Sequence, residues 1–144
     1  MRRLCTFYLD GMLFGIDVDA VQEVLRFQAM TPVPLAPRVV AGLINLRGQI
    51  VTALDLRRRL ELLERPPEML PANVVLRSSA VGASLLVDAV GEVVEVDDVA
   101  FEPPPETTRG VARELILGAY KLPERLLLLL DLKKTLEIGD GVQT

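Results

Sequence analysis

The sequence predicts a mainly β protein built from two small β-barrels that are related by a pseudo-twofold axis, with a few short helices. Three observations lead to this fold class. Half of the 144 residues are hydrophobic but only 4% are aromatic, so the core must be packed from Leu, Val and Ile. Short apolar runs separated by turn residues extend along the chain, which is typical of β-hairpins. The same order of runs also occurs twice.

The repeat appears when residues 42–62 are aligned with residues 118–138, where seven of the 21 positions carry the same residue. A second match aligns Asp19–Val24 with Asp88–Val93, and a proline cluster follows each copy. A barrel of about 60 residues is too small for a stable core of its own, so we expect the copies to share one.

We therefore expect a single domain over residues 1–144. Its approximate subdomains are residues 16–72 and 73–138, and strands within residues 1–15 complete the barrels.

Local signals define the elements of the first half. Asp10-Gly11 and Arg47-Gly48 are hairpin turns, because glycine tolerates positive φ. Three prolines within residues 31–37 exclude regular structure there. Asp55 is a typical N-cap. The expected elements are strands over Leu4–Leu9, Met12–Val18, Gly42–Leu46 and Gln49–Leu54, a helical turn running into a strand over Ala20–Phe27, and a helix over Leu56–Leu63.

The second half repeats this order. Ser78–Gly82 and Pro123–Arg125 are expected turns, Pro103–Pro105 is a second proline hinge, and Gly139 ends the last helix before a loose tail. The expected elements are strands over Asn73–Arg77, Ala83–Val87, Val90–Val96, Leu115–Leu122 and Leu126–Leu130, and a helix over Leu132–Ile138 that is capped by Asp131.

Composition excludes several functions. The chain has no histidine and one cysteine, so the commonest general base and metal ligand is missing and no intramolecular disulfide can form. Cys5 lies in an apolar stretch and is expected to be a buried small hydrophobe. A net charge of −4 argues against nucleic-acid binding. The first residues are too charged for a signal peptide and no apolar run could span a bilayer, so we expect a cytoplasmic protein without membrane insertion.

No catalytic constellation emerges from the residues. Asp97-Asp98 is interpreted as a solvated loop, and the basic run Arg57–Arg59 as a solvated helix face. The acidic run from Val87 to Glu106 is also interpreted as a solvated face, or alternatively as an electrostatic guide for a basic partner. These features favour an interaction module over an enzyme. An acid-dependent hydrolase would require two carboxylates facing each other across a cleft.

The repeat separates structural positions from the rest. Asp55-Leu56 and Asp131-Leu132 occur in both copies and are expected to cap and anchor a helix. Arg47 aligns with Pro123, so the fold does not need arginine there. Arg47 is either an ordinary turn residue or a guanidinium directed at a carboxylate, such as Glu23 or one on a partner.

Several of these segments together resemble the CheW family, the coupling proteins of bacterial chemotaxis. In the first half they are Val21–Val24, the proline-rich link, Gly42–Ile50 and Leu54–Arg57. In the second half they are Leu86–Val93, Pro103–Pro105 and Leu130–Leu132. The family usually continues Arg-Gly-x-Ile-x-Pro-Val, and this sequence departs from that pattern at Thr52-Ala53.

The resemblance implies two five-stranded SH3-like barrels and an adaptor without catalysis, metal or cofactor. It implies that the adaptor links the cytoplasmic hairpin tip of a chemoreceptor (a methyl-accepting chemotaxis protein) to the regulatory domain of the histidine kinase CheA. A CheW-like adaptor of another chemosensory pathway, such as gliding motility or development, is the alternative. Carried across residue by residue, the receptor groove comprises Val21, Glu23, Gly42, Asn45 and Arg47 from the first barrel and Val74, Val90 and Val93 from the second.

Overall fold

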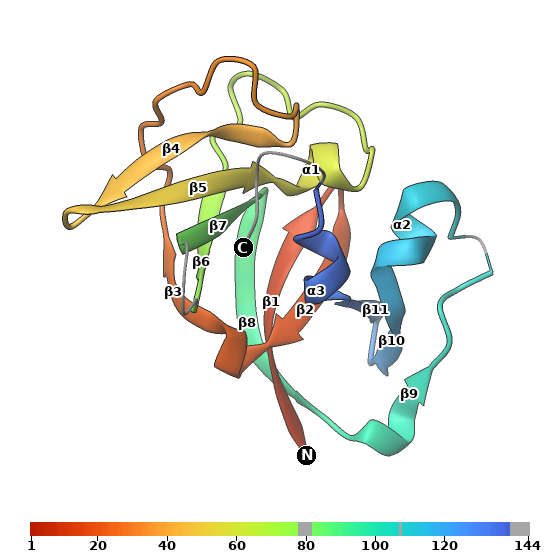
Figure 1. Ribbon diagram of the computed structural model, residues 1–144. Helices are drawn as coiled ribbons and strands as arrows, with labels where there is room; N and C mark the ends of the chain where they lie inside the picture. Colours follow the sequence, from red (N-terminus) through yellow and green to blue (C-terminus); the bar gives the residue numbers. More distant parts are fainter. Residues whose placement is uncertain (78–81, 107, 139–144) are drawn as a thin grey trace.

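The computed structural model describes residues 1–77, 82–106 and 108–138, and its strands form two sheets. Figure 1 shows β3–β7 on the left and β9–β11 on the right, with β1, β2 and β8 between them. The predicted mainly β fold class is therefore confirmed.

The first sheet has five strands in the order β3-β6-β7-β5-β4. Their bounds are β3 Val21–Leu25, β4 Val40–Leu46, β5 Gln49–Asp55, β6 Ala72–Leu76 and β7 Gly82–Val87. The second sheet has six strands in the order β8-β1-β2-β11-β10-β9. Their bounds are β1 Arg2–Leu9, β2 Met12–Asp17, β8 Ala89–Val96, β9 Phe101–Glu102, β10 Ile116–Leu122 and β11 Arg125–Leu130.

The strand pairings confirm the internal repeat. The β4–β5 and β10–β11 hairpins hold equivalent places, and β5 pairs parallel to β7 as β11 pairs parallel to β2. The β1–β2 hairpin therefore takes in the second sheet the place that β6–β7 takes in the first. Ala119 and Leu43 are equivalent positions in the two hairpins, and each has a partner on a further segment. Ala119 pairs with Glu102 of β9, and Leu43 forms a bridge with Thr31.

The boundary between the two copies lies elsewhere than predicted. Strands β6 and β7 pair with β3 and β5, so the first sheet extends to Val87 instead of ending near residue 72. The strands that begin within residues 1–15 belong only to the second sheet and add nothing to the first. The sequence repeat can be aligned only up to the helix after each hairpin. In the structure, β6 and β7, which follow α1, still belong to the first copy.

The helices are short. α1 covers Leu56–Arg59 and α3 covers Leu132–Thr135, both shorter than predicted, and α2 at Gly110–Leu115 was not predicted. The φ of 57° at Glu61 turns the chain away from α1. Both predicted N-caps are confirmed, with Asp55 Oδ1 accepting from the Arg57 amide at 3.0 Å and Asp131 Oδ1 from the Lys134 amide at 3.0 Å. Two 3₁₀ turns, η1 (Val18–Ala20) and η2 (Asp98–Ala100), complete the elements. The predicted tail and most of the turn 78–82 lie outside the described residues.

One apolar cluster is shared by the two sheets, as the sequence predicted. It joins Phe7 and Phe14 of the second sheet to Leu54, Val74 and Leu85 of the first. Each sheet adds a smaller cluster of its own, around Leu4 and Leu127 in the second sheet and around Ile44 and Leu86 in the first. Cys5 is buried, and burial raises the pKa of its thiol. Across the described ranges, the helices are all too short or too polar to cross a membrane.

Candidate functional site

The tip of the β4–β5 hairpin carries the strongest candidate residue. Leu46 pairs with Gln49, so Arg47 and Gly48 form a two-residue turn, with φ values of 50° and 88°. Positive φ at both positions is the geometry of a type I′ turn, which matches the twist of the flanking strands. Asn45 Oδ1 accepts a hydrogen bond from the Gly48 amide at 3.0 Å and fixes the turn.

Arg47 reaches across to β3, where its guanidinium forms an ion pair with the carboxylate of Glu23. The Arg47 side chain is 66% exposed and that of Glu23 is 25% exposed. The hydrogen bond from Arg47 lowers the pKa of Glu23 below its usual value. The contact that the sequence suggested is therefore present, on a face that a partner can reach.

Three of the predicted groove valines lie on the outermost strands of their sheets. Val21 is on β3, and Val90 and Val93 are on β8. Val21 and Val90 are partly buried against the shared core, whereas Val93 is 49% exposed. These strands therefore offer partly exposed apolar side chains beside the shared core.

Two predicted groove residues are not available to a partner. Val74 is fully buried at 0% exposure, because β6 is an inner strand whose side chain at this position packs into the shared core. Gly42 is also buried, and a Cβ there would lie 2.9 Å from both Met30 Cβ and the Thr31 oxygen. Glycine at position 42 allows the proline-rich segment to lie close over β4.

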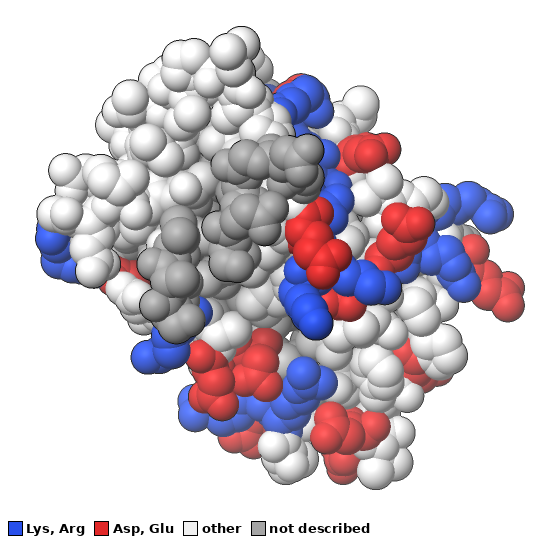
Figure 2. Space-filling model, in the orientation of Figure 1, with Lys and Arg blue, Asp and Glu red and all other residues white. Residues whose placement is uncertain are grey.

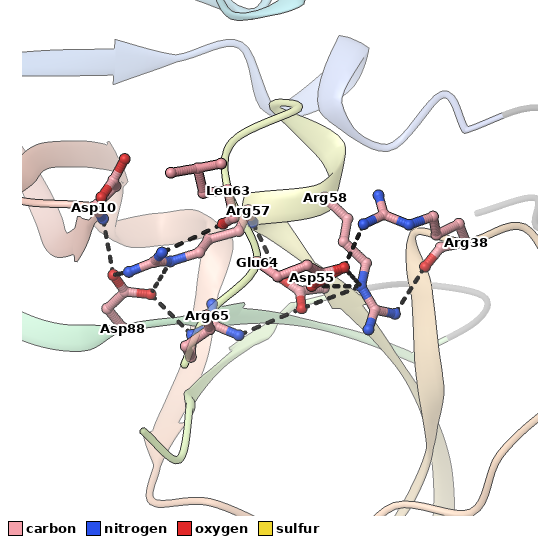
Figure 3. A network of polar contacts seen from close by, with 9 residues as sticks. All are labelled: Asp10, Arg38, Asp55, Arg57, Arg58, Leu63, Glu64, Arg65 and Asp88. Atoms are coloured by element: carbon pink, nitrogen blue, oxygen red, sulfur yellow. Dashed lines mark hydrogen bonds and ion pairs between the residues drawn. The ribbon is translucent and has the colours of Figure 1, made fainter. Parts of the chain in front are cut away.

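A buried ionic cluster was not predicted from the sequence. Arg57 is only 5% exposed, so the interpretation of Arg57–Arg59 as a solvated face is wrong for this residue. Asp88, from the supposedly solvated acidic run, is its partner. We call this group the Asp88 cluster; it comprises Asp10, Arg38, Asp55, Arg57, Arg58, Glu64, Arg65 and Asp88, and Figure 3 shows them in contact.

Asp88 is at the centre of this cluster. Arg57 Nε donates to Asp88 Oδ1 at 2.9 Å and Arg57 Nη2 to Oδ2 at 2.5 Å. Arg65 Nε donates to Oδ1 at 2.9 Å, and the Asp10 amide donates to Oδ2 at 2.8 Å. Burial acts to raise the pKa of Asp88, but the hydrogen bonds from Arg57, Asp10 and Arg65 outweigh it and the pKa is lowered.

Arg65 joins Asp88 to the cap of α1. Arg65 Nη1 donates to Asp55 Oδ2 at 3.3 Å, and the side chains of Arg65 and Asp55 are each 7% exposed. Arg58 and Glu64, with Nε and Oε1 3.0 Å apart, extend the network toward Arg38 at the surface. The run of three arginines on a short helix could have indicated that one of them is buried, because one side of α1 must face the protein.

Asp97 and Asp98, the adjacent acidic pair, have ordinary partners. Asp97 accepts from the Val99 amide at 3.0 Å and Asp98 from the Tyr120 hydroxyl at 3.2 Å, and both aspartates are exposed as predicted. The described residues contain no group of three acidic, cysteine or histidine side chains placed to hold a metal ion. Figure 2 shows that charged side chains gather on the right and at the bottom of this face, whereas the region around β4 carries few.

Comparisons with known proteins agree on one family. The family model described as a CheW-like domain matches residues 3–139. The chain is 32% identical to a chemotaxis protein CheW of Treponema pallidum over 136 residues, covering 92% of this chain and 80% of that protein. It is 27% identical to a chemotaxis protein CheW of Thermotoga maritima over 140 residues, covering 95% and 91%. The crystal structure of the scaffolding protein TtCheW from Thermoanaerobacter tengcongensis superposes with a TM-score of 0.85 at 28% identity, covering 99% of this chain and 97% of that one.

Proposed function

This chain belongs to the family of CheW-like domains, and from that premise we propose that it is a non-catalytic adaptor of bacterial chemotaxis-type signalling. It couples the cytoplasmic hairpin tips of chemoreceptors to the regulatory domain of the histidine kinase CheA. It acts in the cytoplasm, without a cofactor. The observation that carries this proposal is the geometry of Arg47.

The type I′ turn requires a left-handed backbone at position 47, but it does not require an arginine there. A φ of 50° places a long side chain in the left-handed region, which costs about 1–2 kcal/mol relative to right-handed backbone. The equivalent position holds Pro123, so the β10–β11 hairpin forms without an arginine there. Bulky residues held in sparsely populated backbone regions cluster at functional sites. This supports a binding role for the guanidinium.

The surroundings of Arg47 suit a helical partner. Glu23 holds the guanidinium in place, which reduces the side-chain freedom that must be lost on binding. The partly exposed Val21 and Val93 can accept the aliphatic side chains of a receptor helix. A receptor carboxylate would then pair with Arg47 and fix the register of the helix.

Binding to a receptor tip fragment and to the CheA regulatory domain tests the proposal. Each affinity is measured by calorimetry, for the wild type, for Arg47→Glu and for Lys133→Glu, an exposed cation of α3 that serves as control. We expect Arg47→Glu to weaken receptor binding by about tenfold or more, because it places like charges together. The control is expected to bind as the wild type does. If the wild type binds neither partner, the proposal fails.

A charge swap separates recognition from structure. The double variant Glu23→Arg/Arg47→Glu keeps the internal ion pair with reversed polarity. If Arg47 recognises a receptor carboxylate, the double variant stays folded and still binds poorly. Full recovery of binding would show that the pair matters only inside this chain.

A further inference from the structure

The two sheets are joined by two short links of the chain. Val18–Ala20 (η1) leads from β2 to β3, and Asp88 alone leads from β7 to β8. Each link leads into its next strand through the same Asp-Ala-Val sequence, Asp19–Val21 in one and Asp88–Val90 in the other. The repeat therefore offers the same side chain at two equivalent links.

Only one of the two aspartates contacts both sheets. The Asp88 carboxylate accepts from the amide of Asp10, in the β1–β2 turn of the second sheet, and from Arg57 on α1, which lies between β5 and β6 of the first sheet. The Asp88 amide also donates to the Tyr8 oxygen of β1 at 2.9 Å. Asp19 is exposed, and Arg77 holds its link through the carbonyl oxygens of Asp19 and Val21, at 3.2 and 3.3 Å.

The features of the Asp88 cluster indicate that it specifies one arrangement of the two sheets instead of adding stability. Arg65 Nη2 is buried and finds no hydrogen-bond partner among the described residues, which is unfavourable for a polar atom. Replacing a buried ion pair by apolar side chains is often neutral or stabilising, whereas its directional hydrogen bonds can specify one arrangement. The shared apolar core supplies attraction without direction.

We propose that Asp88 is a positioning residue, an ionic joint that fixes the orientation of the second sheet relative to the first. Asp88 directly precedes β8, which carries Val90 and Val93, so the joint also presets where these two valines lie relative to the first sheet. The part of the inference that concerns partner binding rests on the proposed adaptor function. The joint itself does not.

Distances between spin labels test the joint directly. Nitroxides are attached at the exposed Gln49 of the β4–β5 hairpin and Glu124 of the β10–β11 hairpin, in a Cys5→Ala background. The variant Asp88→Asn replaces one carboxylate oxygen by an amino group that cannot accept from arginine. The matched control is Asp19→Asn at the equivalent position.

We expect a single narrow distance distribution in the parent protein and in Asp19→Asn. In Asp88→Asn the distribution should broaden or gain a second maximum, while amide exchange within each sheet stays slow. An unchanged distribution in a folded Asp88→Asn protein would show that the apolar core alone sets the orientation, and would overturn the proposal. If Asp88→Asn does not fold, Arg65→Gln, which removes only the bridge between Asp55 and Asp88, is measured against the same criterion.

Acid provides a second measurement on the unmodified side chain. Because the folded state lowers the pKa of Asp88, the joint is intact at neutral pH and is lost as the pH falls through that lowered pKa, below the usual value of about 4. Arg57, Arg65 and Asp10 face Asp88, and Asp55, Arg58, Glu64 and Arg38 lie further along the network. We expect acid to broaden the parent distribution, and Asp88→Asn to be broad already at neutral pH. If acid broadens a narrow Asp88→Asn distribution as it does the parent, the joint belongs to another carboxylate.

The joint and the adaptor function can fail separately. The label distances are measured without a partner, and the affinities on unlabelled proteins. If both proposals hold, Asp88→Asn should lose receptor affinity in proportion to the fraction of molecules outside the native distribution. A broadened distribution in a protein that binds no receptor fragment would support the joint and refute the adaptor function.

Discussion

The β4–β5 and β10–β11 hairpins occupy equivalent places in the two sheets but turn in different ways. Both close on a two-residue turn, between Leu46 and Gln49 in one and between Leu122 and Arg125 in the other. The first turn has positive φ at both residues, whereas the second begins with Pro123, whose ring fixes a negative φ. Only the first turn holds an exposed cation over a carboxylate on another strand.

The helices that follow the two hairpins also differ in their charged side chains. α1 and α3 begin with a capping aspartate and an apolar anchor, but Arg57 is buried in the Asp88 cluster and its counterpart Lys133 is exposed. The two copies thus share caps and core positions and differ in their charged side chains. Features that recur in both copies support the fold, whereas the buried ion pairs at α1 have no counterpart at α3 among the described residues.

The largest expected effect comes from removing the charge of Arg57 in α1, compared with removing that of its counterpart Lys133 in α3. Arg57→Met should lower the free energy of unfolding by about 3–5 kcal/mol, because it leaves Asp88 buried with one partner fewer. Lys133→Met should change it by no more than about 0.5 kcal/mol. Urea denaturation measures both, and equal losses would contradict the difference between the copies.

Glycines at equivalent positions should show that both copies need close backbone packing. A Cβ at Gly118 would overlap Phe101 and the Glu102 oxygen, and one at Gly42 would lie 2.9 Å from the Thr31 oxygen. We expect either Gly→Ala change to cost about 1–3 kcal/mol, with the larger loss at Gly118. Gly15→Ala is the control, because its nearest neighbour is the flexible Leu127 side chain at 3.1 Å.

The capping aspartates provide a finer comparison. Asp131→Ala removes one cap hydrogen bond and should cost about 1 kcal/mol in thermal unfolding. Asp55→Ala should cost more, because it also leaves the buried Arg65 without one of its partners. If the two losses are equal, the contact between Asp55 and Arg65 contributes nothing measurable.

The smallest effect on stability is expected at the hairpin tip. Arg47→Gly relieves the left-handed backbone but loses an exposed ion pair and frees the unfolded chain, so the free energy of unfolding should change by less than about 1 kcal/mol. Receptor binding should still be lost. A strongly destabilised Arg47→Gly protein would instead indicate that Arg47 serves the first copy structurally.

Local patterns predicted most of the fold. Turn residues located the hairpins at Asp10-Gly11 and Arg47-Gly48, and Asp55 and Asp131 correctly marked the start of a helix. The repeat predicted the two related sheets and the shared core. These features succeed because they depend on neighbouring residues or on residue types that recur in both copies.

Long-range contacts were not predictable in the same way. Asp88 lies 31 residues from Arg57 and 23 from Arg65 in the sequence, and no periodicity records their contact. Val74 was assigned to the groove by resemblance, but its burial depends on β6 being an inner strand. The sheet boundary was misplaced because the repeat is permuted along the chain, so that the first hairpin completes the second copy.

This permutation affects how the protein folds during synthesis. Strand β2 pairs with β11, since Leu13 lies beside Leu127, so the first hairpin to leave the ribosome must wait for the last of the described strands. The five strands of the other sheet are contiguous in sequence and can pair earlier. At about 5–20 residues per second, the early hairpin remains without this neighbour for several seconds. Leu4 and Leu13, which pack with Leu127 and Leu129 of β11 in the finished fold, lack these neighbours during that interval.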